Sequence, residues 1–203
     1  TGVQTADLWV VEAFPAYSLM ANAHFPLALA LMVAIAGSGL RIIQVDNPER
    51  ENRVRIWAFG LALTIGALAL GAIQPFGLVP VFGGLLVTLI ARTIRDGAVP
   101  WQSAGWIVGG ALFALPYPLY MQVAIRSDPV LVAWNSQNIT TSPPVWDWAL
   151  SFGLVLILAI RGAAAAVRRG SDVDVMILGW CCVSLIGMYV PLPLQRRLTI
   201  GLG

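Results

Sequence analysis

Lysine is absent from this sequence, histidine occurs once and cysteine occurs twice. Only 11% of the 203 residues are charged, against roughly a quarter in an ordinary soluble domain. A single histidine excludes the paired axial histidines of a membrane haem protein. Cys181 and Cys182 are adjacent, so a disulfide between them would be strained, and with the distant His24 they are too few to bind a metal. We therefore expect packing roles for the cysteines and no metal site, and the sequence does not identify a cofactor.

The residues that are present are mostly apolar, at 58% of the chain, with 20 glycines and 13 prolines. A soluble protein of this length could not bury so much apolar surface, and membrane helices accept both glycine and proline. Apolar runs of near-spanning length alternate with short polar breaks. This pattern predicts an all-α, polytopic transmembrane bundle of about six helices. The predicted spans are 25–43, 56–74, 78–91, 101–125, 146–160 and 173–190.

Proline and glycine divide these spans. The string Gln74-Pro-Phe-Gly77 predicts a tight hairpin between the second and third spans. Pro116 and Pro118 predict a kink near the far end of the fourth span, because proline removes a helix hydrogen bond. The third and fifth spans are short, so we expect them to be tilted or lengthened by flanking residues.

Two pairs of small residues predict close helix packing. Gly105 and Gly109 form a GxxxG pair on the fourth span, and Ala67 and Gly71 form a similar pair on the second. Small side chains at this spacing let two helix backbones approach each other in a membrane.

The arginines predict an orientation. If residues 1–24 lie on the non-cytoplasmic side, nine of the twelve arginines fall in the cytoplasmic connections 41–55, 92–100 and 161–172. Such a bias follows the positive-inside rule for a multi-pass protein of the cell membrane. The exceptions are Arg126, Arg196 and Arg197.

The two ends of the sequence indicate a larger protein. Thr1 is not an initiator methionine, and residues 198–203 resemble the start of a further apolar segment. We expect one transmembrane domain over 1–203 that is a piece of a longer protein. Its expected partners are membrane lipids and further helices of the same protein or of partner subunits; we expect no nucleic-acid partner.

Charged residues are missing from the middle of every predicted span. Buried charges in a membrane normally mark ion and proton pathways. Their absence disfavours pumps, proton-coupled transporters and channels with charged filters. Any activity should therefore lie at a membrane face.

The first outer segment supplies acidic candidates. Asp7 and Glu12 are five residues apart, so neither a helix nor a strand would place them on one face. Either could act alone as a general base, or both could be solvated acids at the interface. His24, at a predicted helix start, could bind a substrate or have a structural role.

The second outer segment, 126–147, combines aromatic rings with amides. An aromatic face can stack on the C–H face of a sugar while amides bond its hydroxyl groups. The same residues could instead form an interfacial aromatic belt with an ordered, proline-stiffened loop. The candidate ligand-binding residues are Trp134, Asn135, Gln137 and Asn138.

Arg196 and Arg197 follow the proline-stopped sixth span on the side that otherwise has few arginines. The guanidinium fork suits the oxygens of a lipid-linked phosphate. Ordinary anchoring to lipid headgroups is the alternative.

Several strings resemble segments of large bacterial polytopic membrane proteins: Asp7-Leu-Trp…Glu12, Ala21-Asn-Ala-His-Phe-Pro26, Trp134-Asn-Ser-Gln-Asn…Ser142-Pro-Pro144 and Pro193-Leu-Gln-Arg-Arg197. Those proteins are similar to membrane glycosyltransferases of the C-type fold, the class that includes the dolichyl-phosphate mannosyltransferases. In that class an outer-loop acid activates the acceptor, and basic residues hold a lipid-phosphate sugar donor.

The resemblance implies a glycosyltransferase that uses a polyprenyl-phosphate sugar at the outer membrane face. Asp7 would be the catalytic base, with Glu12 second, and Arg196 and Arg197 would bind the donor phosphate. The segment around Trp134 would line the sugar or acceptor site. The alternative is a non-catalytic membrane subunit or scaffold of a larger complex.

Overall fold

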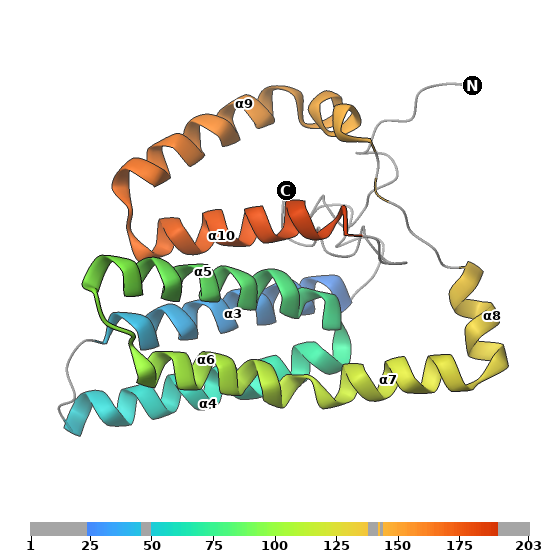
Figure 1. Ribbon diagram of the computed structural model, residues 1–203, viewed down its shortest axis with the longest axis horizontal. Helices are drawn as coiled ribbons and strands as arrows, with labels where there is room; N and C mark the ends of the chain where they lie inside the picture. The colour runs from blue at the N-terminus through green and yellow to red at the C-terminus, as the bar shows by residue number, and fades with distance from the viewer. Residues whose placement is uncertain (1–23, 46–49, 138–141, 143, 191–203) are drawn as a thin grey trace.

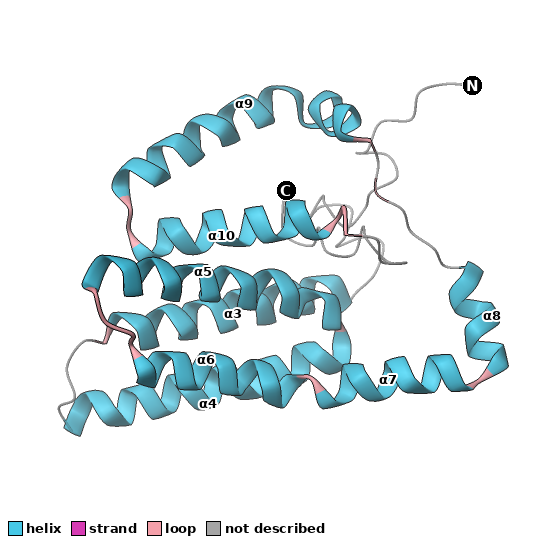
Figure 2. Cartoon of the chain, in the orientation of Figure 1, coloured by secondary structure: helices cyan, strands magenta, loops and turns pink. Residues whose placement is uncertain are grey.

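The computed structural model describes residues 24–45, 50–137, 142 and 144–190, and its elements there are all helical. The helices are labelled in Figure 1, and Figure 2 shows no strand in this part of the chain. The predicted all-α fold is therefore confirmed. The elements are α3 (His24–Gln44), α4 (Arg50–Ile73), η2 (Pro75–Gly77), α5 (Leu78–Asp96), α6 (Trp101–Ala114), α7 (Pro116–Ser127), α8 (Pro129–Gln137), α9 (Val145–Arg169) and α10 (Asp172–Gly187).

The helices run back and forth between two ends of a bundle (Figure 1). At one end, α5 and α9 finish and α6 and α10 begin; we call it the arginine end, because Arg92, Arg95 and Arg169 lie there. At the other end, which we call the hairpin end, η2 joins α4 to α5 and α7 leads into α8. The described connections therefore fall at the two ends to which the sequence assigned them.

Five helical stretches of the described chain are long and apolar enough to cross a membrane: His24–Gln44, Arg53–Ile73, Pro75–Asp96, Trp101–Ser127 and Leu150–Arg169. The sixth predicted span corresponds to α10, whose 16 residues cover only about 24 Å. The chain is thus a multi-pass integral membrane protein. Many large apolar side chains on these helices are exposed, as expected for surfaces that contact lipid.

Two helices extend beyond their predicted spans. The third span, predicted as 78–91, is α5 and ends at Asp96, while the fifth, predicted as 146–160, is α9 and runs from Val145 to Arg169. Their arginines therefore belong to helices and not to the connections that the sequence predicted. Long arginine side chains can reach the interface from a helix, so a polar residue does not by itself end one.

Two helix breaks have identifiable causes. The predicted kink in the fourth span is confirmed: α6 ends at Ala114 and α7 begins at Pro116, because proline cannot donate the next helix hydrogen bond. A second break lies inside α9 at Gly153, where φ is 44° and ψ is −117°. Only glycine adopts this conformation without strain, so a side chain there would oppose the bend.

The bundle core joins α3, α4, α5 and α6, with α10 packed on α5 (Figure 1). Successive turns of α3 and α4 bury side chains against each other at helical spacing. These fully buried side chains are Ala28, Met32, Ile35, Leu63, Ala67 and Leu70.

Close helix approaches use different glycines from those predicted on α6. A Cβ added at Gly71 would lie 2.9 Å from the Ala114 carbonyl oxygen, so the predicted close packing at this residue is confirmed. Gly105 and Gly109 have nothing within 4 Å of an added Cβ, so the GxxxG pair does not pack within the described bundle. Gly110, which faces Leu63, makes the contact instead. Residue spacing alone could not show which face of α6 meets α4.

Candidate functional site

The hairpin between α4 and α5 places Gln74 inside the protein. The Gln74 N–H donates to the Leu70 carbonyl at 2.8 Å, and the Gln74 carbonyl accepts from the Gly77 N–H at 3.0 Å. Pro75 begins η2 and fixes the direction of the turn. The Gln74 residue is only 3% exposed, and its side-chain Nε2 has no hydrogen-bond partner among the described residues. A buried amide in this state is rare and costs free energy unless a ligand or water completes its bonding.

The turn between α7 and α8 brings a second segment toward this hairpin. Asp128 Oδ1 accepts hydrogen bonds from the N–H groups of Val130 at 2.7 Å and Leu131 at 3.4 Å. This N-cap, followed by Pro129, starts α8 and turns the chain away from the axis of α7 (Figure 1). The sequence had predicted a loop here, so the helix is a correction. Its signal was the Asp-Pro pair, which is typical of a helix start.

A cavity of about 440 Å³ lies between these segments. Residues from the end of α4, from η2, and from α5, α7 and α8 line it. Trp134 and Asn135 line it from α8, so the structure brings two of the predicted binding residues to one site with the hairpin. None of the residues that line it is charged. The polar members are Gln74, Tyr117, Gln122, Trp134 and Asn135.

The other predicted binding residues are not gathered at this cavity. Gln137 is the last residue of α8, is exposed and does not line the cavity. His24 is the exposed first residue of α3, with its ring centroid 4.6 Å from that of Phe25. The remaining candidates lie outside the described residues: Asp7, Glu12, Asn138, Arg196 and Arg197.

Sequence reasoning missed three polar residues of the cavity. The sequence pattern predicts a hairpin at Gln74 and places Tyr117 and Gln122 in the fourth span, and it assigns none of the three to a binding site. The signal for Gln74 was available, since an amide next to a proline turn at the end of an apolar span is an unusual choice. Its burial depends on α7 and α8, whose positions the sequence does not reveal.

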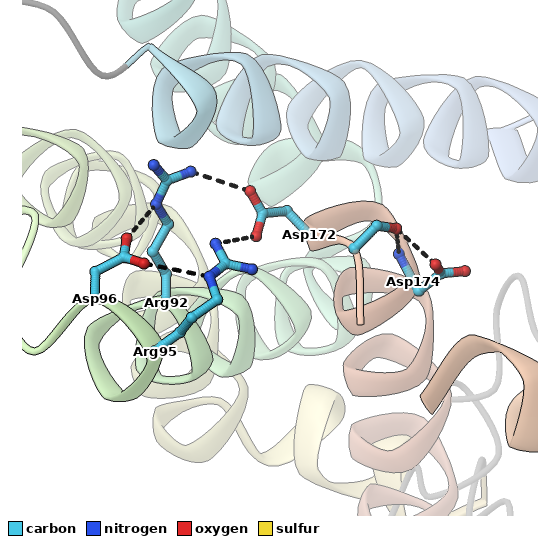
Figure 3. Close-up of polar contacts among 6 residues, drawn as sticks. Arg92, Arg95, Asp96, Asp172 and Asp174 are labelled. Atoms are coloured by element: carbon cyan, nitrogen blue, oxygen red, sulfur yellow. Dashed lines mark hydrogen bonds and ion pairs between the residues drawn. The ribbon is translucent and has the colours of Figure 1, made fainter. Parts of the chain in front are cut away.

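A second polar cluster lies at the arginine end (Figure 3). Asp172, in the first turn of α10, accepts from Arg92 at 3.1 Å and from Arg95 at 3.0 Å. Asp96 bonds to the same two arginines at 2.9 Å and 3.2 Å. The side chains of Arg92 and Asp172 are each 11% exposed. These charges satisfy one another and fasten the end of α5 to the start of α10.

The start of α10 is also capped locally. The Ser171 hydroxyl donates to Asp174 Oδ2 at 2.6 Å and accepts from the Asp174 N–H at 3.2 Å (Figure 3). Arg169 donates to Asp174 Oδ1 at 2.6 Å. A serine followed three residues later by an acid is a readable capping signal. The arrangement explains why α10 begins at Asp172 and leaves no side chain of this group free for a ligand.

A buried acid lies in the first turn of α9. Asp147 is 3% exposed, and its Oδ1 has no hydrogen-bond partner among the described residues. It does not line the cavity beside Gln74. No group of three or more His, Cys, Asp or Glu side chains that could hold a metal occurs in the described part of the chain.

The cavity at the hairpin end is therefore the strongest candidate site in the described structure. It combines a fixed, buried amide with two predicted ligand-binding residues, whereas the cluster at the arginine end is satisfied internally. Comparisons of this chain with protein-family models, curated proteins and solved structures find no match.

Proposed function

We propose that this membrane protein binds a lipid-linked sugar at the hairpin end and acts in glycosyl transfer from a polyprenyl-phosphate donor. The observation that carries the proposal is the cavity itself, in which Trp134 and Asn135 come together with Gln74. Most ligand sites have volumes of roughly 300–1,000 Å³ and combine apolar walls with a few placed polar groups. The cavity of about 440 Å³ fits that description.

The lining of the cavity suits the head of such a lipid. The Trp134 ring, which is 55% exposed, offers an aromatic face for sugar stacking. The amides of Gln74 and Asn135 offer donors and acceptors for hydroxyl groups. Exposed apolar residues at the rim, including Val79 and Leu115, give the lipid chain a path from the membrane.

The proposed reaction assigns roles to residues outside the described ranges. An acceptor hydroxyl attacks the anomeric carbon of the donor sugar, and the bond from that carbon to the phosphate oxygen breaks. Asp7, with Glu12 as second candidate, takes the hydroxyl proton, and polyprenyl phosphate leaves. Arg196 and Arg197 hold the phosphate, and His24 contributes to binding near the start of α3. We expect this site on the non-cytoplasmic side of the cell membrane, because the arginine bias of the sequence follows the positive-inside rule.

A non-catalytic subunit is the second candidate, and α9 favours it. Among the described helices α9 packs mainly against α10 (Figure 1), and many of its apolar side chains are exposed. Leu154, Ile157 and Leu158 are 71%, 56% and 60% exposed. A helix of this kind can be covered by lipid or by the helices of a partner subunit.

The test is to replace Trp134 by Ala and measure sugar transfer from a polyprenyl-phosphate sugar by the full-length protein in lipid nanodiscs. We expect the rate of transfer at subsaturating donor to fall about fivefold to tenfold, since losing a stacking face removes roughly 1–1.5 kcal/mol of binding. Trp101→Ala is the matched control, because Trp101 is 78% exposed at the opposite end of the bundle. If both variants lose activity only in proportion to the amount of folded protein, Trp134 does not bind the substrate.

A further inference from the structure

We infer that the cavity at the hairpin end selects an uncharged, hydroxyl-bearing lipid head group, and that the buried Gln74 amide is the anchor that holds it. The sugar identity of that head rests on the proposed function. The selection of a neutral head over a phosphate does not, because it follows from the cavity lining alone.

Gln74 is held in place by its backbone and not by its side chain. Both its N–H and its carbonyl are bonded within the hairpin, at 2.8 Å to Leu70 and 3.0 Å to Gly77. The residue is 97% buried, as the complement of its 3% exposure, yet Nε2 has no hydrogen-bond partner in the described structure. Nε2 itself has almost no accessible surface, so a ligand oxygen reaches it only when the side chain turns toward the cavity, a movement that breaks no protein hydrogen bond. A ligand that completes the bonding of this amide offsets the cost of burying it unsatisfied, which is the basis of the proposed anchor role.

The lining also determines the charge of the ligand. None of the residues that line the cavity is Asp, Glu, Arg, Lys or His. A phosphate inside it would lose its hydration and gain only neutral donors, which is unfavourable at a site of low polarity. Hydroxyl groups can instead exchange water for the amides of Gln74 and Asn135 at little cost. The uncharged lining therefore favours a position of the sugar within this cavity and of its phosphate outside it.

The walls divide into a polar part and an apolar part. Leu78, Met121 and Ile125 line the cavity together with the exposed Val79 and Leu115. These side chains belong to α5, α7 and the break between α6 and α7. A chain attached to the bound head can leave along them. The cavity thus suits an amphipathic ligand better than a free sugar.

Binding to the full-length protein in phosphatidylcholine nanodiscs tests this inference. The probes are farnesyl β-glucoside (a neutral sugar head), farnesyl monophosphate (a charged head) and dioleoylglycerol (a hydroxyl head without sugar). We expect the glucoside to bind and farnesyl monophosphate to bind at least tenfold more weakly. Gln74→Leu should weaken glucoside binding about tenfold, the loss of one good hydrogen bond. The matched control is Gln102→Leu, on the exposed first turn of α6 at the arginine end.

A second variant fills part of the cavity and leaves the Gln74 amide unchanged. Val79→Trp places a larger side chain at the cavity rim, where Val79 is 48% exposed, so folding should be retained while glucoside binding is lost. Thermal unfolding without ligand checks folding of each variant. Equal binding of farnesyl monophosphate and glucoside, or unchanged binding by Gln74→Leu, would overturn the inference.

The remaining outcomes separate this inference from the proposed function. If dioleoylglycerol binds as tightly as the glucoside with the same dependence on Gln74, the neutral-head site stands and its ligand is a diacylglycerol. If the glucoside binds through Gln74 but the wild-type protein transfers no sugar from a polyprenyl-phosphate donor, the site stands and the proposed reaction fails.

Discussion

Two polar residues with little exposed surface lie at opposite ends of the same bundle and differ in their hydrogen bonding. At the arginine end, Asp172 accepts hydrogen bonds from both Arg92 and Arg95. At the hairpin end, Gln74 is buried at 3% exposure, and its Nε2 has no partner in the described structure. At the arginine end the polar groups therefore bond to one another and hold α5 and α10 together. At the hairpin end an uncharged donor is left unsatisfied beside a cavity, and a bound ligand would complete its hydrogen bonding.

The largest expected difference between the ends is in their accessibility from outside the cell. On a background without Cys181 and Cys182, we expect Ser136→Cys at the hairpin end to react with a membrane-impermeant maleimide in intact cells. Val99→Cys at the arginine end should react only after lysis. Both positions are exposed, so burial does not decide the result. The reverse labelling pattern would invert the orientation that the arginine bias predicts.

The next effect concerns the strength of the arginine cluster. Asp172→Ala removes the ion pairs that join Arg92 and Arg95 of α5 to α10, while Asp96 still bonds to both arginines. We expect a loss of about 2 kcal/mol in the free energy of unfolding, between the values for exposed and buried ion pairs. Asp96→Ala is the matched control, because Asp96 bonds to the same arginines but has a side chain 41% exposed, against 11% for Asp172. Denaturation in detergent measures both. Equal losses would mean that burial does not distinguish the two pairs.

Much of this fold was predictable because proline and glycine mark it. The string Gln74-Pro-Phe-Gly77 predicted the hairpin, and Pro116 predicted the break between α6 and α7. The short third and fifth spans predicted helices that are tilted or lengthened by flanking residues, and α5 and α9 are lengthened in this way. Hydropathy does not fix the residue at which they end, since arginine can extend from a helix into the interface. Local sequence patterns therefore predicted the turns better than the helix ends.

The candidate site was predictable only in part. The composition of 126–147 pointed to Trp134 and Asn135, and both line the cavity. Gln74 lies some sixty residues earlier, and nothing local in the sequence states that α7 and α8 will meet its hairpin. The GxxxG pair illustrates the same limit, because Gly110 and not Gly105 or Gly109 faces α4. Contacts between distant segments depend on helix rotation, which spacing alone does not fix.

The smallest effect that we expect is a change in the free energy of unfolding at the hairpin end, and it compares the two ends most directly. In ligand-free protein, Gln74→Leu removes a buried amide that has no Nε2 partner and replaces it with a side chain of similar size. We expect the free energy of unfolding to rise by about 1 kcal/mol, because the cost of burying an unsatisfied donor disappears. Gln102→Leu, at an exposed position, should leave stability nearly unchanged. Thermal unfolding in detergent without added glycolipid measures the difference. Loss of stability in Gln74→Leu would mean that the amide is already engaged within the protein, and the contrast with Asp172, whose removal destabilises the bundle, would no longer hold.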